Sequence, residues 1–436
     1  MDIATSSDSQ KPKQPLRSRS LARGTAARES TATSHLPFDQ AATVVLGDLQ
    51  HALLDLFAAA PSEIRKAADV ERVFGINHLL GWQLYRIAHA QNPLAAGSHV
   101  PAKVSMKKLL TAAARRRIPT NVVATVASAF DAFERFAEVD LDGRDELDAI
   151  LTSFVPEERH KNELLSRQSV FKGMSQIKGI AAQFDVAAHF FHPSSDGRSI
   201  DRVSLNCEIG LRRIRPDAPI ILGSGDIAKS EVEMLTLDGR QPDGPMGAML
   251  PQFSTSPLPN VEILRFADTV FHQVADREVG MRSAIDLVLA DRRLAALPRF
   301  WQPGTPKYRN LYYLTDTPVK RMTLDVFMHR DVFLDDPPQL YVYDSVGTPV
   351  TIRYGDPAKE HHRLITQDVI RPLPRGVMDA RLPHFSRYLE ILDYIFATVG
   401  WNSHEFRCYR LDVPYPVYGG EYGMSIRMPE GTGERA

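Results

Sequence analysis

Hydrophobic residues recur at three- and four-residue steps in the first third of the chain, which is the spacing of one face of an α-helix. One such stripe is formed by Leu46, Leu49, Leu53, Leu56 and Phe57. A second stripe is formed by Val122, Val126, Phe130, Phe133 and Phe136. The first run stops at Pro61, because proline cannot continue a helix. We interpret both stripes as buried faces of helices in a domain that spans residues 37–160.

The period changes to two beyond about residue 170, as it does in a strand with one buried face. The first alternating set is Phe184, Val186, Ala188 and Phe190. The next set is Val203, Leu205, Cys207, Ile209 and Leu211. Because Ser194–Gly197 has the composition of a turn and lies between the two sets, the sequence predicts a β-hairpin.

Further segments extend the mixed pattern to the C-terminal part of the chain. Alternation over 322–328, followed by 340–343, a turn at Gly347 and 350–354, predicts another hairpin. Helical spacing returns over 278–294 and over 384–399. Because hairpins outnumber strand–helix–strand units, we expect an α+β protein. An all-α, helix-turn-helix-like domain would precede a larger domain, residues 170–430, of antiparallel β-sheet and packed helices.

Residues 1–36 contain few large apolar side chains and predict a disordered tail. The basic residues of this tail are Lys11, Lys13, Arg17, Arg19, Arg23 and Arg28, and its acidic residues are Asp2, Asp8 and Glu29. The tail either serves as an inert solubilising segment or makes weak contacts with nucleic acid.

Length and composition limit the classes of protein that fit. A chain of 436 residues exceeds the size that one core supports, so we expect at least two cores. Its formal net charge is −1, so any affinity for nucleic acid must come from local clusters of cations. Cys207 and Cys408 stand too far apart in sequence to form a disulfide framework, which favours reduced thiols. With no run of about 18 apolar residues and no secretory signal, we expect a cytoplasmic protein without a membrane partner.

Residues 62–90 read SEIRKAADVERVFGINHLLGWQLYRIAHA. We expect a helix that ends near Phe74, a tight turn at Gly75 and a second helix after Ile76. The apolar positions that would hold the pair together are Val70, Val73, Phe74, Ile76, Leu79, Leu80 and Leu84. The segment resembles the helix-turn-helix of bacterial transcriptional regulators. Glu71 stands where that motif usually has a small residue, and Gly81 where it usually has a β-branched one.

The resemblance implies that the second helix enters the major groove of DNA. Its outward side chains would be Asn77, His78, Trp82, Gln83 and Arg86. Of these, Asn77, His78, Gln83 and Arg86 are the candidates for contacts with DNA, since Asn, Gln and Arg can form paired hydrogen bonds with base edges.

A run of positive charge follows this segment between Pro101 and Arg117, with no acidic residue among its members. The run consists of Lys103, Lys107, Lys108, Arg115, Arg116 and Arg117. From Ile118 to Glu158 acidic residues predominate. Lysine and arginine neutralise backbone phosphates, so the run is a candidate phosphate-binding surface. A solvated helix face without a ligand is the alternative.

Other groups of residues give weaker indications. His189 and His192 lie three apart on a predicted strand and therefore face opposite sides, and His361 and His362 are adjacent, so we expect no metal site. No motif for a cofactor or for a catalytic residue is present, and we predict neither. The aromatic stretch 401–423 either covers the sheet or forms a binding surface.

These patterns together favour a DNA-binding transcriptional regulator of bacterial type. Its C-terminal domain would sense a small-molecule effector or mediate oligomerisation, and homodimerisation would match two DNA half-sites. Two alternatives stay open: an enzyme whose site lies in the C-terminal α+β domain, and a protein–protein docking scaffold.

Overall fold

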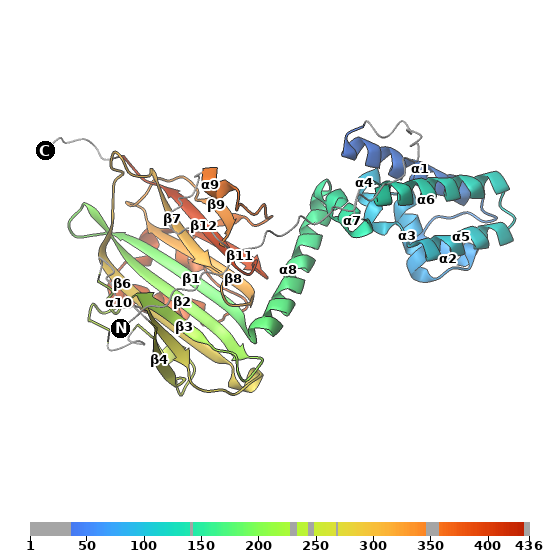
Figure 1. Ribbon diagram of the computed structural model, residues 1–436. Coiled ribbons are helices and arrows are strands. Elements are labelled where there is room, and N and C mark those ends of the chain that lie inside the picture. Colours follow the sequence, from blue (N-terminus) through green and yellow to red (C-terminus); the bar gives the residue numbers. More distant parts are fainter. Residues whose placement is uncertain are drawn as a thin grey trace, which may run out of the picture. The chain divides into compact units, whose positions relative to one another are not determined.

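The chain divides into a helical unit, Met1–Val155, and a sheet unit, Pro156–Ala436 (Figure 1). The computed structural model describes residues 36–139, 143–226, 233–242, 248–266, 269–345 and 357–430. Helices alone build the first unit and mixed sheets with helices build the second, so the predicted α+β class is confirmed. The predicted disordered tail lies outside the described residues apart from Leu36.

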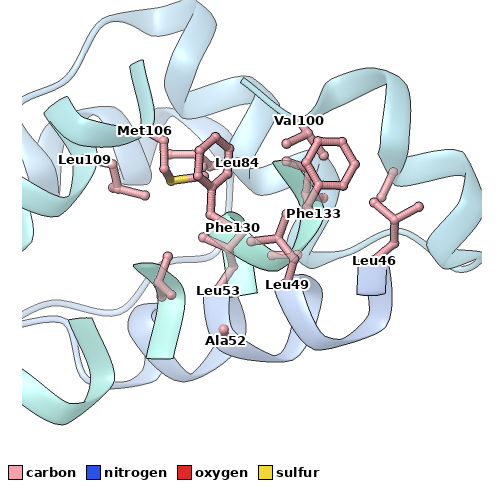
Figure 2. Packing of buried hydrophobic residues seen from close by; sticks show 14 of the residues in the cluster. Leu46, Leu49, Ala52, Leu53, Leu84, Val100, Met106, Leu109, Phe130 and Phe133 are labelled. Atoms are coloured by element: carbon pink, nitrogen blue, oxygen red, sulfur yellow. The ribbon is translucent and has the colours of Figure 1, made fainter. Parts of the chain in front are cut away.

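The helical unit is built around two long helices whose apolar stripes were evident in the sequence. Its helices are α1 (Phe38–Ala58), α2 (Ala67–Phe74), α3 (His78–Ala88), α4 (Pro93–Ala96), α5 (Lys103–Arg115), α6 (Thr120–Val139) and α7 (Arg144–Ser153). Leu49 and Leu53 of α1 are fully buried in one cluster with Phe133 of α6 (Figure 2). The other helices add apolar side chains to the same cluster, including Leu84 of α3 and Leu109 of α5.

Among the described helices, α1 alone is long and apolar enough to cross a membrane by length and composition. Half of the most apolar 18-residue stretch of α1 is buried inside the structure. The same side chains that make α1 apolar, such as Leu46 and Leu56, form the core of the helical unit.

The sheet unit is organised around a six-stranded sheet in the order β10-β11-β8-β1-β2-β6. Its strands are β1 (Ile180–Pro193), β2 (Ser199–Arg213), β6 (Ile285–Pro298), β8 (Val319–His329), β10 (Ile370–Leu373) and β11 (Phe406–Pro414). The β1–β2 hairpin is confirmed, and its turn uses Gly197 at φ 68°, a left-handed conformation that glycine adopts without strain. Only β1 and β8 pair in parallel within this sheet.

Two smaller sheets complete the strand content of the described residues. One has the order β7 (Tyr308–Leu314), β12 (Gly420–Arg427) and β9 (Gln339–Asp344). The other has the order β3 (Ile221–Asp226), β5 (Thr269–Val274) and β4 (Val261–Phe266). The first packs on one face of the six-stranded sheet, where Phe191 and Leu324 share a cluster with Met424.

The opposite face of the six-stranded sheet is covered by α10 (Tyr388–Val399). Phe190 and Phe327 stack there at 4.6 Å, and Phe396 of α10 meets Phe190 edge-on at 5.5 Å. The predicted helix over 384–399 is therefore confirmed, and Gly400 ends it at φ 74°. A further helix, α8 (Pro156–Lys178), belongs to this unit, where its Arg167 forms an ion pair with Asp368.

The helix predicted over 278–294 is wrong, because β6 occupies residues 285–298. Leu287, Val288 and Ala290 are all buried, so consecutive side chains on both faces of this strand contact apolar neighbours. A strand buried on both faces loses strict alternation and can imitate helical spacing. In the second predicted hairpin, 340–343 falls in β9, which pairs with β12, and 350–354 lies outside the described residues.

A buried ion pair joins three elements of the sheet unit. Asp325 of β8 is fully buried and accepts two hydrogen bonds from Arg410 of β11, at 2.7 and 2.6 Å. The Tyr388 hydroxyl of α10 donates a third at 2.7 Å. Breaking such a pair leaves a desolvated charge without a partner, which costs more than the pair itself contributes.

We predict that Asp325→Ala lowers the free energy of unfolding of the sheet unit by about 3–5 kcal/mol. The exposed pair Arg240–Asp238, at 2.6 Å, supplies the control, because Asp238→Ala should cost no more than about 1 kcal/mol. Urea unfolding of both variants measures the difference. Equal destabilisation by the two substitutions would contradict the role given to Asp325.

Candidate functional site

The predicted helix pair in the helical unit is present with the expected turn. Helix α2 ends at Phe74, and Gly75 follows at φ 65°. The Gly75 N–H donates to the Glu71 carbonyl at 2.8 Å and closes the end of the helix. Asn77 then caps α3, since its side-chain oxygen accepts a hydrogen bond from the Leu80 N–H at 2.8 Å.

Gly81 lets the two helices approach closely. A Cβ atom at this position would lie 3.2 Å from the Glu71 nitrogen and 3.3 Å from the Ala67 carbonyl oxygen, both backbone atoms of α2. A β-branched side chain does not fit against a backbone that near. The small residue of this pair therefore stands in the second helix, and Glu71 in the first helix remains half-exposed, 3.2 Å from His78 Nδ1.

The outer side of α3 carries the side chains that the resemblance assigned to DNA contacts. Asn77, His78 and Arg86 are exposed, and Gln83 is half-buried. The Arg86 guanidinium lies over the ring of Trp82, which is 40% exposed, at 5.9 Å from the centroid. Two of these groups already have local partners, because the Asn77 oxygen caps the helix and His78 faces Glu71.

One apolar residue of this segment is placed differently from the expectation. Leu79 was expected to lock the helix pair, but its side chain is 64% exposed. Leu80 and Leu84, four residues apart, are among the buried positions of α3 and mark its inner face. Leu79 lies one residue from that stripe, a rotation of about 100° around the helix axis, and therefore points outward.

The cationic run forms the outer face of α5 and its end. All six of its members are exposed, and none forms a salt bridge with a carboxylate of the described residues. Met106, Leu109 and Ala113 on the opposite side of α5 are buried in the core. The helix therefore presents its lysines and arginines as one face, anchored by an apolar face beneath it.

The basic cluster adjoins the helix pair. A Cβ atom placed on Gly75 would lie 3.9 Å from Nη2 of Arg116, so this guanidinium is beside the turn between α2 and α3. Sequence alone could not establish this proximity, because about 40 residues separate the two positions.

The helix dipole explains the positions of only some of the six cations. Arg115 and Arg116 lie at the C-terminal end of α5, where positive charge is favoured by the helix dipole. Arg117 adopts φ 59° and completes the helix end, with the Ile118 N–H bonded to the Ala113 carbonyl at 3.3 Å. Lys103, in contrast, is the first residue of α5, where the same dipole disfavours a cation.

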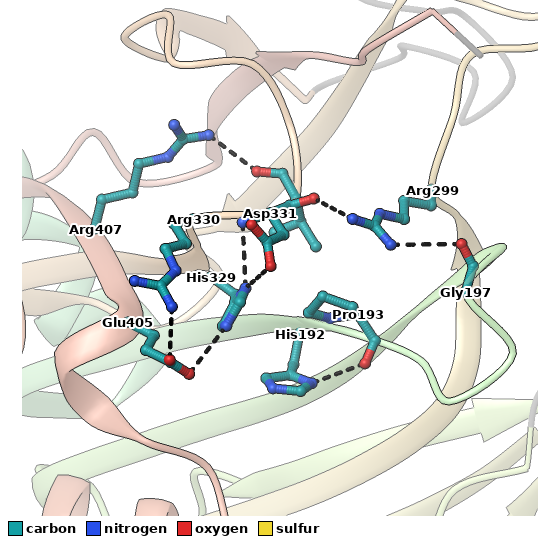
Figure 3. Close-up of polar contacts among 10 residues, drawn as sticks. His192, Pro193, Gly197, Arg299, His329, Arg330, Asp331, Glu405 and Arg407 are labelled. Carbon is teal, nitrogen blue, oxygen red and sulfur yellow. Dashed lines mark hydrogen bonds and ion pairs between the residues drawn. The ribbon is translucent and has the colours of Figure 1, made fainter. Parts of the chain in front are cut away.

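A second group of interest lies in the sheet unit around two histidines (Figure 3). The ring of His192 stacks on Trp401 at 4.8 Å and meets His329 at the same distance. His329 Nδ1 accepts a hydrogen bond from the Asp331 N–H at 3.2 Å, so its Nε2 carries the proton and donates to Glu405 at 3.2 Å. Burial lowers the pKa of His192, which favours its neutral form.

The histidine group connects strands β1 and β8 with the segment around Glu405. Within the described ranges, no hydroxyl or thiol is hydrogen-bonded to His192 or His329, so no nucleophile is paired with a base. No cluster of three or more His, Cys, Asp or Glu residues suited to a metal is found there either. Sequence analysis did not single out His329 or Glu405, which come from segments distant from His192.

His189 and His192 face opposite sides of the sheet, as predicted from strand geometry. The residues His361 and His362 lie in another part of the sheet unit, after the short helix α9 (Pro357–Glu360). The aromatic stretch 401–423 contributes β11 and the start of β12, so Cys408 and Tyr422 from it are buried in the sheet unit.

Two acidic side chains, the buried Asp185 and the half-buried Glu208, lie on the side of the six-stranded sheet that faces β7. Asp185 and Glu208 are direct cross-strand partners on β1 and β2, and the Tyr313 hydroxyl of β7 donates to Asp185. Burial raises the pKa of Asp185 to about 7 and raises the pKa of Glu208 well above its ordinary value. Two carboxylates this close in a desolvated space are favoured when they hold a proton.

We predict that Gly81→Val destabilises the helical unit by about 1–3 kcal/mol, because the new side chain meets the α2 backbone. Gly47, around which a Cβ would find nothing within 4 Å, provides the control: Gly47→Ala should be neutral or stabilising. Thermal unfolding of both variants tests the close approach. A tolerated valine would show that α2 and α3 are farther apart than described.

We predict that the stability of the sheet unit falls as pH rises from about 4 to about 7 through the raised pKa of Asp185. In this range the folded state binds a proton that the unfolded carboxylate has lost. Asp185→Asn should therefore stabilise the unit by roughly 1–3 kcal/mol at pH 8 and flatten the pH dependence. The exposed Asp393 on α10 gives the control Asp393→Asn, which should retain the wild-type pH profile. An unchanged pH profile in Asp185→Asn would contradict the assignment.

Comparisons with known proteins do not place the chain in a family. No family model and no curated protein matches it. Among solved structures, an M1 zinc metallopeptidase from Deinococcus radiodurans is similar over 57% of this chain and 42% of its own, at 10% identity and a TM-score of 0.20. A candidate protease from Parabacteroides distasonis is similar over 58% and 41% of the two chains, at 11% identity and a TM-score of 0.23. The chain thus spans about two fifths of these proteins, and similarity at this level assigns neither fold family nor activity.

Proposed function

We propose that the helical unit binds duplex DNA through the basic face of α5 and the outer side of α3, and that the chain is a DNA-binding transcriptional regulator. The sheet unit would then sense a ligand or mediate association. The observation that carries the proposal is the cluster of six exposed cations that form no salt bridge with a described carboxylate, one of which lies beside the turn of the helix pair.

Electrostatics supports a polyanionic partner. Lys103 and Lys107 are four residues apart on α5, and like charges at this spacing destabilise a helix by about 0.2–0.5 kcal/mol. Contact with phosphates would replace this repulsion by attraction and release counterions. A cation at the first position of α5 does not stabilise the helix, because the helix dipole disfavours positive charge there. An anionic ligand therefore explains the position of Lys103 better.

The outer side of α3 offers groups for contact with bases. Arg86 can donate two hydrogen bonds to guanine, and the exposed Leu79 suits the methyl group of thymine. The Asn77 amide still has its two N–H donors, because the helix cap uses only its oxygen. Asn77 and Leu79 lie at the start of α3, the part of a recognition helix that meets base edges, and Arg86 lies in its last turn.

Exposed apolar residues favour a second candidate, the docking of another protein. Leu79 and Val104 are 64% and 68% exposed in the helical unit. Salt separates the two proposals, because binding through phosphates weakens steeply with salt while an apolar contact does not.

We predict that the protein binds a short DNA duplex of random sequence with a dissociation constant of about 10⁻⁴–10⁻⁶ M at physiological salt. If all six cations meet phosphates, the slope of log K against log salt approaches about −5. Lys107→Glu with Arg116→Glu should abolish binding without unfolding the protein, as fluorescence anisotropy and circular dichroism would show.

The matched control reverses two exposed cations of the sheet unit, Lys172→Glu with Arg282→Glu, and changes the net charge equally. It should leave DNA affinity within about twofold of wild type. Equal losses in both double variants would mean that net charge, and not α5, sets the affinity. Crosslinking and recovery of genomic DNA then tests the regulator: discrete enriched sites that vanish in the α5 variant support it, and uniform recovery argues against it.

A further inference from the structure

The sheet unit contains a cavity of about 330 Å³ at one end of the space between its two packed sheets. Its walls are apolar on both sides: Phe191 comes from β1 of the six-stranded sheet, and Leu311 and Ile426 come from β7 and β12 of the three-stranded sheet. Phe333 adds an aromatic wall and meets Phe191 edge-on at 5.4 Å. A cavity of this size and lining is suited to a small organic molecule.

Two arginines line this apolar space from opposite sheets. Arg202 of β2 is the cross-strand partner of Phe191, and Arg309 of β7 is the cross-strand partner of Ile426. Neither side chain forms a hydrogen bond or a salt bridge with a described residue, and the Nε atom of each is buried without a partner. The Nε atoms of Arg167 and Arg407 also lack a partner, but these two guanidinium groups form salt bridges, whereas Arg202 and Arg309 form none with a described residue.

Neighbouring groups supply only part of the negative charge that would balance Arg202, because Asp291 attracts it without forming a salt bridge with it. The cross-strand neighbour of Arg202 on β6 is another cation, Arg293, which lies 3.3 Å from Asp291. That carboxylate is therefore already engaged by Arg293. His189, close to Arg202, is kept neutral because burial lowers its pKa to about 3, and its Nδ1 atom is also buried without a partner.

Two other arginines of the sheet unit show the pairing with a carboxylate that Arg202 and Arg309 lack. Arg410 is paired with Asp325 at 2.6 Å, and Arg167 with Asp368 at 2.6 Å. Burial in the absence of such a carboxylate lowers the pKa of Arg309. An arginine that serves only as a structural element would be expected to have a comparable partner.

We propose that this cavity binds an amphipathic anion, with a carboxylate or phosphate headgroup held between Arg202 and Arg309 and an apolar body against Phe191, Leu311 and Ile426. The planar guanidinium fork matches both headgroups, and the apolar walls account for the rest of the molecule. The site lies wholly within the sheet unit. Ligand binding at this site can therefore be tested independently of DNA binding by the helical unit.

Calorimetric titration of the full chain with octanoate, octyl phosphate and octanol tests the inference. Either anion should bind at least tenfold more tightly than octanol, whose apolar chain is the same. The tighter of the two anions identifies the headgroup. Equal affinity for octanol would overturn the claim that the site is anionic, and no binding by any of the three would overturn the site itself.

Variants localise the binding to the two arginines. Arg202→Met and Arg309→Met should each weaken binding of the preferred anion at least tenfold, while Arg282→Met, which removes an exposed cation elsewhere, should leave it unchanged. Arg309→Lys keeps the charge and should retain more affinity than Arg309→Met. Unchanged affinity in folded Arg202→Met and Arg309→Met proteins would place the ligand elsewhere and overturn the proposal. If a methionine variant fails to fold, the comparison of anions with octanol still decides the anionic character of the site.

Discussion

Positive charge without a matching carboxylate is the feature on which the functional account of this protein depends. Arginines that hold the fold together have partners, as Arg410 has Asp325 and Arg167 has Asp368. Two sets of neighbouring cations, in contrast, form no salt bridge with a described residue: the exposed face of α5, and the pair Arg202 and Arg309 that lines one cavity of the sheet unit. Because an unpaired cation costs free energy in a crowded or desolvated place, each set points to an anion from outside the chain.

The α5 cations and the pair Arg202 and Arg309 suit different anions, because their surroundings differ. The cations of α5 are exposed on an extended helix face, where each contact is weak and many phosphates are needed for affinity. Arg202 and Arg309 are half-buried and line a partly open cavity with apolar walls, where a single headgroup can meet two guanidinium groups. A polyanion suits the first surroundings, and a small amphipathic molecule suits the second.

Periodicity in the sequence predicted the elements with strong patterns. The stripes of α1, α6 and α10 could be predicted because a single buried face sets each pattern. The β1–β2 hairpin is buried on both faces, but its large apolar residues still alternate and a turn with Gly197 separates its strands. Strand β6 was mistaken for a helix since Leu287, Val288 and Ala290 are all buried, so the pattern reflects both faces of the strand. The parallel pairing of β1 with β8 depends on contacts between distant segments. Local periodicity contains no information about such contacts.

The candidate site residues likewise divide into those that local sequence features predict and those that only tertiary contacts bring together. Exposure of the α5 cations follows from the apolar positions of Met106 and Leu109, and the turn at Gly75 follows from its residue type. The proximity of Arg116 to that turn is a tertiary contact and had no local signal. The same is true of Arg202 and Arg309, which are ordinary strand arginines until the two sheets bring them to one cavity.

Lysine-acetylation footprinting with and without duplex DNA tests the central claim most directly, because it reports on individual side chains of the folded protein. We expect Lys103, Lys107 and Lys108 to lose reactivity toward the acetylating reagent when DNA is added. The exposed Lys172 of the sheet unit should be as reactive with DNA as without it. Unchanged reactivity of the three α5 lysines at DNA concentrations that saturate the protein would contradict the account.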